Sequence, residues 1–322
     1  MSLVFAAAPA AGQTHGLPLQ RVRDIRLTGG SNRFDYQSVD ADGRHLYISH
    51  LGDSALDVID LDTLTEVATV RNIAGVHGVL AAPDIGRVFA SATGTNELIT
   101  LDASTSQVIA RTPTGDFPDG IAYDPRDDLV LVSNKNAGSE TVIAGRSGQP
   151  IRTVQVGREV GNVAYDPSRG LAYAAVRPPD QIAAFDPTTG TITARIRLKN
   201  CRGAHGVYLQ PQAQQAFVAC EDNAKLVMVD LRERRQTAVA SVGDNPDVLA
   251  YDPGLERLYV AAESGVVAVF SPTGTSLRKL GQAHLASTAH SVAVDPTTHL
   301  VFLPLQRDPD KPGLRVMKPL GT

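Results

Sequence analysis

The segment that decides the fold reads PDGIAYDP and runs from Pro118 to Pro125. Six further segments align with it, and we call the second residue of each the anchor. The other segments are Phe34–Ala41, Val76–Pro83, Val160–Pro167, Ala204–Pro211, Pro246–Pro253 and Ala289–Pro296. The anchors are Asp35, His77, Asp119, Gly161, His205, Asp247 and His290, spaced 42, 42, 42, 44, 42 and 43 residues apart. A period this constant over the whole chain indicates a repeat architecture.

Each repeat follows the same order of short segments. An apolar strand after the anchor leads through a turn to a β-branched or aromatic strand such as Val130–Ser133. An alternating third strand ends in Asp, as in Leu98–Asp102, and a fourth follows, as in Ile192–Leu198. Four short strands in each period of roughly 40–45 residues are typical of a propeller blade. We therefore predict one all-β, seven-bladed β-propeller domain with four-stranded blades over residues 18–322.

The two ends of the chain are expected to close the ring together. The seventh repeat contains only three predicted strands, Ser291–Asp295, Leu300–Leu303 and Leu314–Lys318. The N-terminal segment Leu19–Leu27 has the character of a fourth strand and precedes the first anchor. We expect it to complete the last blade, because closure removes unpaired sheet edges.

Residues 1–17 lie before the predicted domain and begin MSLVFAAAPAAG. The short apolar stretch and its Ala-x-Ala sites resemble the tail of a secretory signal, although the positive n-region is missing. An Ala-rich tail without a targeting role is the alternative. We expect a periplasmic or secreted protein.

The two cysteines fall in the same repeat. Cys201 lies four residues before the anchor His205, and Cys220 ends the second strand of that blade, so both belong at the same end. In an exported protein this favours a disulfide. A reduced pair, or a thiolate near a metal, is the alternative.

Composition excludes two classes of partner. The chain has a formal net charge of −4, no basic run and no Trp, which argues against nucleic-acid binding. Its longest apolar runs have the length of strands, so we expect no membrane span. Phosphate loops and dinucleotide fingerprints are also missing from the sequence.

Several segments resemble the YVTN-repeat, YncE-like propellers. They are LYISHLGDSALDVIDLDT (46–63), FVACEDNAKLVMVDL (217–231) and the AYDP turns. The resemblance covers nearly the whole chain from about Leu19 and implies a seven-bladed propeller. Propellers of similar shape include lyases, lactonases, ligand binders and scaffolds, so it implies no single activity.

In such propellers the first strand of each blade lines the axis, so the anchors should form a ring at one mouth of the channel. The ring radius is then roughly 7–8 Å, which an imidazole plus a metal–nitrogen bond of ~2.1 Å nearly covers. We therefore predict that His77, His205 and His290 bind one divalent ion, whether zinc, copper, iron, nickel or manganese. Asp35, Asp119 and Asp247 flank these histidines and would orient them. Gly161 would leave a gap for the substrate.

Two other interpretations of the ring stay open. It could form a ligand or acid–base site without metal. Its Asp and His side chains could also serve only to solvate the channel and bind backbone groups where the chain enters each blade.

Loops after the second strands return to the same mouth and supply further candidates. Glu221 and Glu263 are candidate general bases, because each follows a strand end directed at the mouth. With Asp35, Asp119 and Asp247 they make up the predicted catalytic set. The predicted ligand-binding residues are His50, Asn134, Lys135, Arg177, Gln306 and Arg307.

These features predict a metal-dependent enzyme of the hydrolase, lactonase or lyase type that acts on a small polar substrate at the mouth. The alternative function is a non-catalytic propeller that binds a metal ion, a small molecule or a protein partner.

Overall fold

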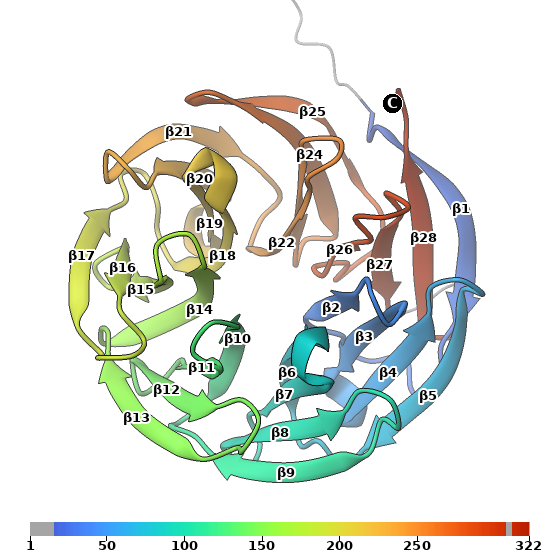
Figure 1. The fold of residues 1–322 in the computed structure, drawn as a ribbon. Helices are drawn as coiled ribbons and strands as arrows, with labels where there is room; N and C mark the ends of the chain where they lie inside the picture. Colours follow the sequence, from blue (N-terminus) through green and yellow to red (C-terminus); the bar gives the residue numbers. More distant parts are fainter. Residues whose placement is uncertain (1–15, 307–310, 322) are drawn as a thin grey trace, which may run out of the picture.

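Seven four-stranded antiparallel sheets stand around a central channel in the computed structural model, which describes residues 16–306 and 311–321 (Figure 1). The predicted all-β, seven-bladed propeller is thus confirmed. The part of the chain described here contains no helix with the length and apolar character needed to cross a bilayer.

Each blade runs from a strand at the channel to a strand at the rim. The first strands, which define blades 1 to 7, are β2 (Gln37–Asp40), β6 (Val76–Ala82), β10 (Pro118–Asp124), β14 (Glu159–Asp166), β18 (Ala204–Gln210), β22 (Pro246–Asp252) and β26 (Ala293–Val294). The second strands are β3 (His45–His50), β7 (Arg87–Ala92), β11 (Leu129–Asn134), β15 (Leu171–Arg177), β19 (Gln215–Cys220), β23 (Arg257–Ala262) and β27 (Val301–Leu305).

The outer half of each blade is built in the same way. The third strands are β4 (Ala55–Asp60), β8 (Glu97–Asp102), β12 (Ser139–Ala144), β16 (Gln181–Phe185), β20 (Lys225–Asp230), β24 (Val266–Thr273) and β28 (Gly313–Pro319). The outermost strands are β5 (Thr65–Arg71), β9 (Val108–Pro113), β13 (Pro150–Gln155), β17 (Ile192–Arg197), β21 (Arg235–Ser241), β25 (Ser276–His284) and β1 (Leu19–Arg26). Short 3₁₀ turns are η1 (Leu51–Asp53), η2 (Pro83–Ile85), η3 (Pro211–Ala213) and η4 (Glu221–Asn223).

The apolar core lies between neighbouring blades. Every residue of β11 and β23 is buried, because a middle strand packs against another blade on each of its two faces. Outermost strands such as β13 instead expose most of their residues. This burial explains why the second strands read as runs of apolar and small residues, whereas the outermost strands alternate with charged ones.

Blade 7 is completed by the N-terminal strand. β1 pairs with β28 in antiparallel register from Leu19 opposite Pro319 to Arg26 opposite Gly313, and the sheet order is β1-β28-β27-β26. The predicted closure is confirmed. Backbone hydrogen bonds between β1 and β28 therefore close the ring. The two strands lie side by side in Figure 1.

Glycines just after the anchors let the first strands approach one another closely. A Cβ atom on Gly78 would lie 2.2 Å from the carbonyl oxygen of Asp119, and one on Gly206 would lie 2.0 Å from that of Asp247. Only glycine fits such contacts. At Gly161 a Cβ would lie 2.5 Å from Cα of His205, so this position is a packing contact and not the expected gap for a substrate.

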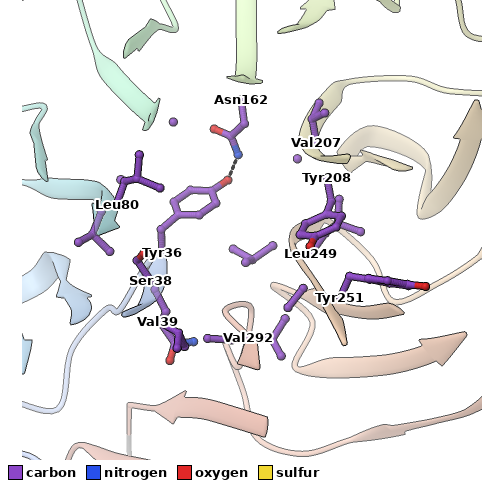
Figure 2. Close-up of a pocket in the computed structure, with 18 of the residues that line it drawn as sticks. Tyr36, Ser38, Val39, Leu80, Asn162, Val207, Tyr208, Leu249, Tyr251 and Val292 are labelled. Atoms are coloured by element: carbon purple, nitrogen blue, oxygen red, sulfur yellow. Dashed lines mark hydrogen bonds between the residues drawn. The ribbon is translucent and has the colours of Figure 1, made fainter. Parts of the chain in front are cut away.

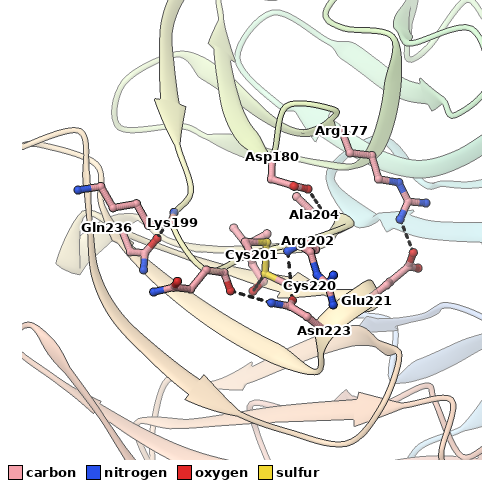
Figure 3. Close-up of a disulfide and its surroundings, with 12 residues drawn as sticks. Arg177, Asp180, Lys199, Cys201, Arg202, Ala204, Cys220, Glu221, Asn223 and Gln236 are labelled. Atoms are coloured by element: carbon pink, nitrogen blue, oxygen red, sulfur yellow. Dashed lines mark hydrogen bonds and ion pairs between the residues drawn. A yellow bond between two sulfur atoms is a disulfide. The ribbon is translucent and has the colours of Figure 1, made fainter.

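A disulfide joins Cys201 to Cys220, with their Cα atoms 5.3 Å apart (Figure 3). It links the segment that enters β18 to the end of β19, as predicted. His205 and Glu221 follow these two cysteines closely in the chain, so the cross-link supports the part of blade 5 that carries both side chains.

Candidate functional site

Six of the seven anchors are buried, and five of these carry polar side chains that lie around one end of the channel. Asp35 and Asp119 are each 2% exposed, His205 3%, Asp247 6% and His290 1%. They come from blades 1, 3, 5, 6 and 7, yet all lie within one connected group of side chains. Burial of three carboxylates at one place is costly without a positive partner. The three buried carboxylates therefore favour the binding of a cation.

Three carboxylate oxygens surround Nε2 of His205. Glu221 Oε1 and Asp247 Oδ1 each lie 3.5 Å away, and Asp119 Oδ2 lies 3.7 Å away. These separations exceed those of ordinary hydrogen bonds. Ligand atoms held tetrahedrally by one ion, with bonds of ~2.1 Å, would be about 3.4 Å apart. Nε2 of His205 and the oxygens of Glu221 and Asp247 all lie within 4.8 Å of one another, so these three residues are close enough to share one ion.

Asp119 reaches His205 because blade 4 places no side chain between them. Gly161 is the anchor of that blade, and the backbone of His205 packs directly over it. The glycine thereby brings together two anchors that are two blades apart.

A second set of ligand atoms consists of Asp35, Asp247 and His290, whose atoms all lie within 4.8 Å of one another. His290 Nδ1 lies 3.0 Å from the carbonyl oxygen of Thr288 and so donates to it. Nε2 is then the ring nitrogen that faces the carboxylates, and it lies 4.0 Å from Asp247 Oδ2. His290 is therefore oriented as a metal ligand.

His77 stands apart from both sets. Its Nδ1 lies 2.8 Å from the carbonyl oxygen of Gly75, its Nε2 lies 3.9 Å from Asp35 Oδ2, and its ring lies 5.2 Å from that of Phe117. Among the described residues, neither group of clustered ligand atoms contains two histidines. The structure therefore does not bring His77, His205 and His290 close enough to bind one ion together. Each set contains one histidine and two carboxylates, and the His77 ring packs beside Phe117.

Several buried polar atoms at this mouth have no hydrogen-bond partner within the protein. They are Asp35 Oδ1, Asp119 Oδ1, Asn162 Oδ1, His205 Nδ1 and His290 Nε2. Most buried polar atoms in proteins are paired, so a concentration of unpaired ones indicates a ligand site. Burial raises the pKa of Asp35 well above its usual range, and the charges of Asp247 and Asp119 raise it further.

Tyr36 extends across the channel next to the two ligand sets. From blade 1 it extends to Asn162 of blade 4, whose amide donates to the phenol oxygen (Figure 2). The phenol donates in turn to Asp247 Oδ1 at 3.0 Å. Burial raises the pKa of Tyr36 well above its usual range, and the charge of Asp247 adds to this effect. A cavity of about 410 Å³ lined by the first strands has Tyr36, Asn162 and Asp247 among its lining residues.

Two arginines pair with the predicted general bases. Arg177 binds Glu221 (Figure 3), and its Nε also lies 2.9 Å from Oε1 of Glu159. Burial opposes ionisation of Glu221, but the nearby charges of His205 and Arg177 outweigh it and lower its pKa. Arg33 binds Glu263, whose other oxygen lies 3.6 Å from His290 Nδ1. Both glutamates therefore lie at the mouth, as expected.

Two predicted ligand-binding residues have structural roles instead. His50 is fully buried, with Nε2 2.9 Å from Asn32 Oδ1 and Nδ1 3.0 Å from Asp57 Oδ2. Asn134 is also fully buried, and its Oδ1 accepts from the N–H of Gly115 at 2.9 Å. Each is the last residue of a second strand rather than the first of a loop, so its side chain packs within the fold. The expectation that they bind a ligand is corrected accordingly.

The remaining predicted residues lie in varied surroundings. Lys135 Nζ lies 5.7 Å from the centre of the Phe117 ring, and Gln306 follows β27 in a half-buried position. Arg307 lies outside the described residues.

Comparison with known proteins supports the fold alone. No family model matches the chain, and no curated protein matches its sequence. A solved structure described as the crystal structure of the mitotic checkpoint complex contains a chain 10% identical, with a TM-score of 0.79 and coverage of 100% of this chain and 97% of that one. A chain of hydrazine synthase from Kuenenia stuttgartiensis is 14% identical, with a TM-score of 0.77 and coverage of 97% and 99%. At these identities the likeness does not extend to the site.

Proposed function

We propose that the mouth of the propeller binds a divalent metal ion through His205, Glu221 and Asp247, and that the protein is a metal-dependent hydrolase, lactonase or lyase. The observation that supports this most directly is the arrangement of three carboxylate oxygens around Nε2 of His205. They lie 3.5 to 3.7 Å from this nitrogen, which is too far for a hydrogen bond to it. A cation accounts for that arrangement, because the oxygens repel one another otherwise.

One imidazole and two carboxylates suit zinc, manganese or iron. Three protein ligands leave a coordination position for water or substrate, as in catalytic metal sites. Asp119 lies slightly farther from His205 and would accept a hydrogen bond from a bound water. Tyr36 would hold Asp247 in place through its phenol.

Such an ion would polarise a substrate carbonyl or acidify a water molecule. Glu263 is the proposed proton acceptor, because its carboxylate lies at the mouth and is oriented by Arg33 and His290. The arginines and carboxylates at the rim favour a small polar substrate.

We also propose that the protein works in the periplasm or outside the cell. The disulfide between Cys201 and Cys220 supports this location, because such bonds persist in oxidising compartments.

A non-catalytic propeller that holds a metal ion or a small molecule is the second candidate. It is favoured by the burial of the ligands, since His205, Asp247 and His290 are each at most 6% exposed. A substrate would have little of these side chains to contact directly.

Elemental analysis of the purified protein, combined with turnover assays on panels of lactones and esters, tests the proposal. We expect bound metal and turnover in the wild type, and loss of turnover together with the ion held by His205 in His205→Ala. His77→Ala, at the equivalent position of blade 2, should keep both and serves as the control. Metal without turnover would favour the binding function, and wild-type protein without affinity for zinc, manganese or iron would refute the site.

A further inference from the structure

The carboxylate of Asp247 faces two histidines from opposite sides. Its Oδ1 lies 3.5 Å from Nε2 of His205 in blade 5, and its Oδ2 lies 4.0 Å from Nε2 of His290 in blade 7. Asp247 itself belongs to blade 6, which stands between them. It is also the one residue shared by both sets of clustered ligand atoms. Each oxygen is therefore available to a different ion.

We infer that the mouth holds two divalent metal ions bridged by Asp247, the first bound by His205 and Glu221 and the second by Asp35 and His290. This rests on the proposed function and extends it from one ion to two. Carboxylates bridge ions about 3.5–4 Å apart in two-metal hydrolytic sites.

The orientation of His290 supports the second half of the inference. Because Nδ1 donates to the carbonyl of Thr288, Nε2 is the ring nitrogen that faces Asp247. This nitrogen is completely buried and has no partner in the protein. A buried ring nitrogen without a hydrogen-bond partner is costly, and an ion between it and Asp247 would satisfy both groups. The first ion, on the far oxygen of Asp247, does not contact this nitrogen.

Asp35 also has a buried polar atom that a second ion would satisfy. It is 2% exposed, belongs to the set with Asp247 and His290, and leaves Oδ1 without a partner. Arg33 forms its salt bridge with Glu263, and its charge does not outweigh the burial of Asp35 and the repulsion from Asp247 and Asp119. A second ion would supply the charge and the coordination that this carboxylate needs.

The repeat explains why two such half-sites arise. Blades 5 and 7 carry histidine at the same position of the repeat, and blade 6 carries aspartate between them. The pseudo-symmetry of the ring therefore places the two imidazoles on either side of one carboxylate. Glu221 and Glu263 also occupy equivalent places after the second strands of blades 5 and 6.

Metal stoichiometry of the full-length protein tests the inference. The protein would be stripped with a chelator, equilibrated with Zn²⁺ or Mn²⁺, and measured by elemental analysis and titration calorimetry. We expect two ions per chain in the wild type, and exchange coupling between two Mn²⁺ ions in electron paramagnetic resonance spectra. His290→Ala and His205→Ala should each retain one ion, and Asp247→Asn should weaken binding of both by at least tenfold.

His77→Ala is the matched control and should keep both ions, because His77 belongs to neither set. His290→Gln, with circular dichroism melting, provides a milder variant should His290→Ala fold poorly. One ion per chain in the wild type, unchanged in a folded His290 variant, would overturn the inference and leave the single-ion proposal intact. A wild type that binds none of Zn²⁺, Mn²⁺ and Fe²⁺ would overturn both.

Discussion

Nδ1 of His50 lies 3.0 Å from Oδ2 of Asp57, and both side chains are completely buried in blade 1. Burial disfavours the charged imidazole, but the hydrogen bond and charge of Asp57 outweigh it and raise the pKa of His50 above its ordinary value of 6.5. Burial also raises the pKa of Asp57. The free energy of unfolding of the propeller should therefore depend on pH through this pair.

A group whose pKa is raised on folding stabilises the protein below its unfolded pKa, and this contribution is lost as the pH rises through the folded value. We expect His50→Gln to lower the free energy of unfolding by about 1–3 kcal/mol at pH 6, and by less at pH 9. Urea unfolding at both pH values measures the difference. The exposed His284→Gln is the control, and an equal loss at both pH values would contradict the prediction.

Glu140 on β12 is completely buried, and its carboxylate accepts from the hydroxyl of Ser133 at 3.0 Å. Burial raises the pKa of Glu140 well above its usual range. Its ionisation therefore opposes folding more strongly as the pH rises above the unfolded value of 4.5. We expect Glu140→Gln to raise the Tm at pH 8 by roughly a few degrees, and to change it little at pH 4. A variant that is less stable at pH 8 would show that the carboxylate makes a contact that glutamine cannot replace.

The phenol of Tyr36 connects Asn162 to Asp247 across the channel. Tyr36→Phe would remove the group that orients Asp247 and leave a buried amide without an acceptor. We expect metal affinity to fall by roughly 10-fold and stability by about 1–2 kcal/mol. Tyr208→Phe, which alters another phenol lining the same cavity, should leave metal affinity unchanged. Equal affinity for Mn²⁺ in Tyr36→Phe and wild type would exclude this orienting role.

The disulfide closes a loop between residues separated by 19 positions in the chain. Replacing both cysteines with serine should reduce the free energy of unfolding by about 3 kcal/mol through the entropy of the unfolded chain. Metal affinity should also fall, because Cys220 directly precedes Glu221 and Cys201 lies close to His205. Thermal melting and metal titration with and without a reductant measure both effects. A melting curve that does not respond to the reductant would contradict the first.

The fold could be predicted from the sequence because the anchors recur at a nearly constant interval. Closure by β1 followed from the missing fourth strand of the last repeat. The convergence of Asp35, Asp119, His205, Asp247 and His290 depends on the same periodicity, because equivalent positions in a ring must meet near its axis.

Other parts of the site depend on side-chain orientation, which periodicity does not determine. His77 occupies the same repeat position as His205, but its imidazole packs against Phe117 and belongs to neither set of clustered ligand atoms. His50 and Asn134 were expected in loops, whereas one further residue of strand pairing places both inside the fold.

Sequence reasoning missed Tyr36, although a signal for it exists. The residue after the anchor is Gly in blades 2, 3 and 5, and Asn, Val and Ser in blades 4, 6 and 7. Tyr36 is the one large side chain at this position of the repeat. A single bulky residue in a ring of small ones is expected to extend across the channel.

The pairing of β1 with β28 has a consequence for biosynthesis. A ribosome produces residues 19–26 before every other strand of the propeller, but their partners, residues 313–319, emerge only after all the others. Until then blade 7 is incomplete, and Asp35 and His290 lie on opposite sides of an open seam. A nascent chain that has not reached residues 313–319 therefore leaves this seam open, and any ion that bridges it would be acquired only after these residues have been synthesised.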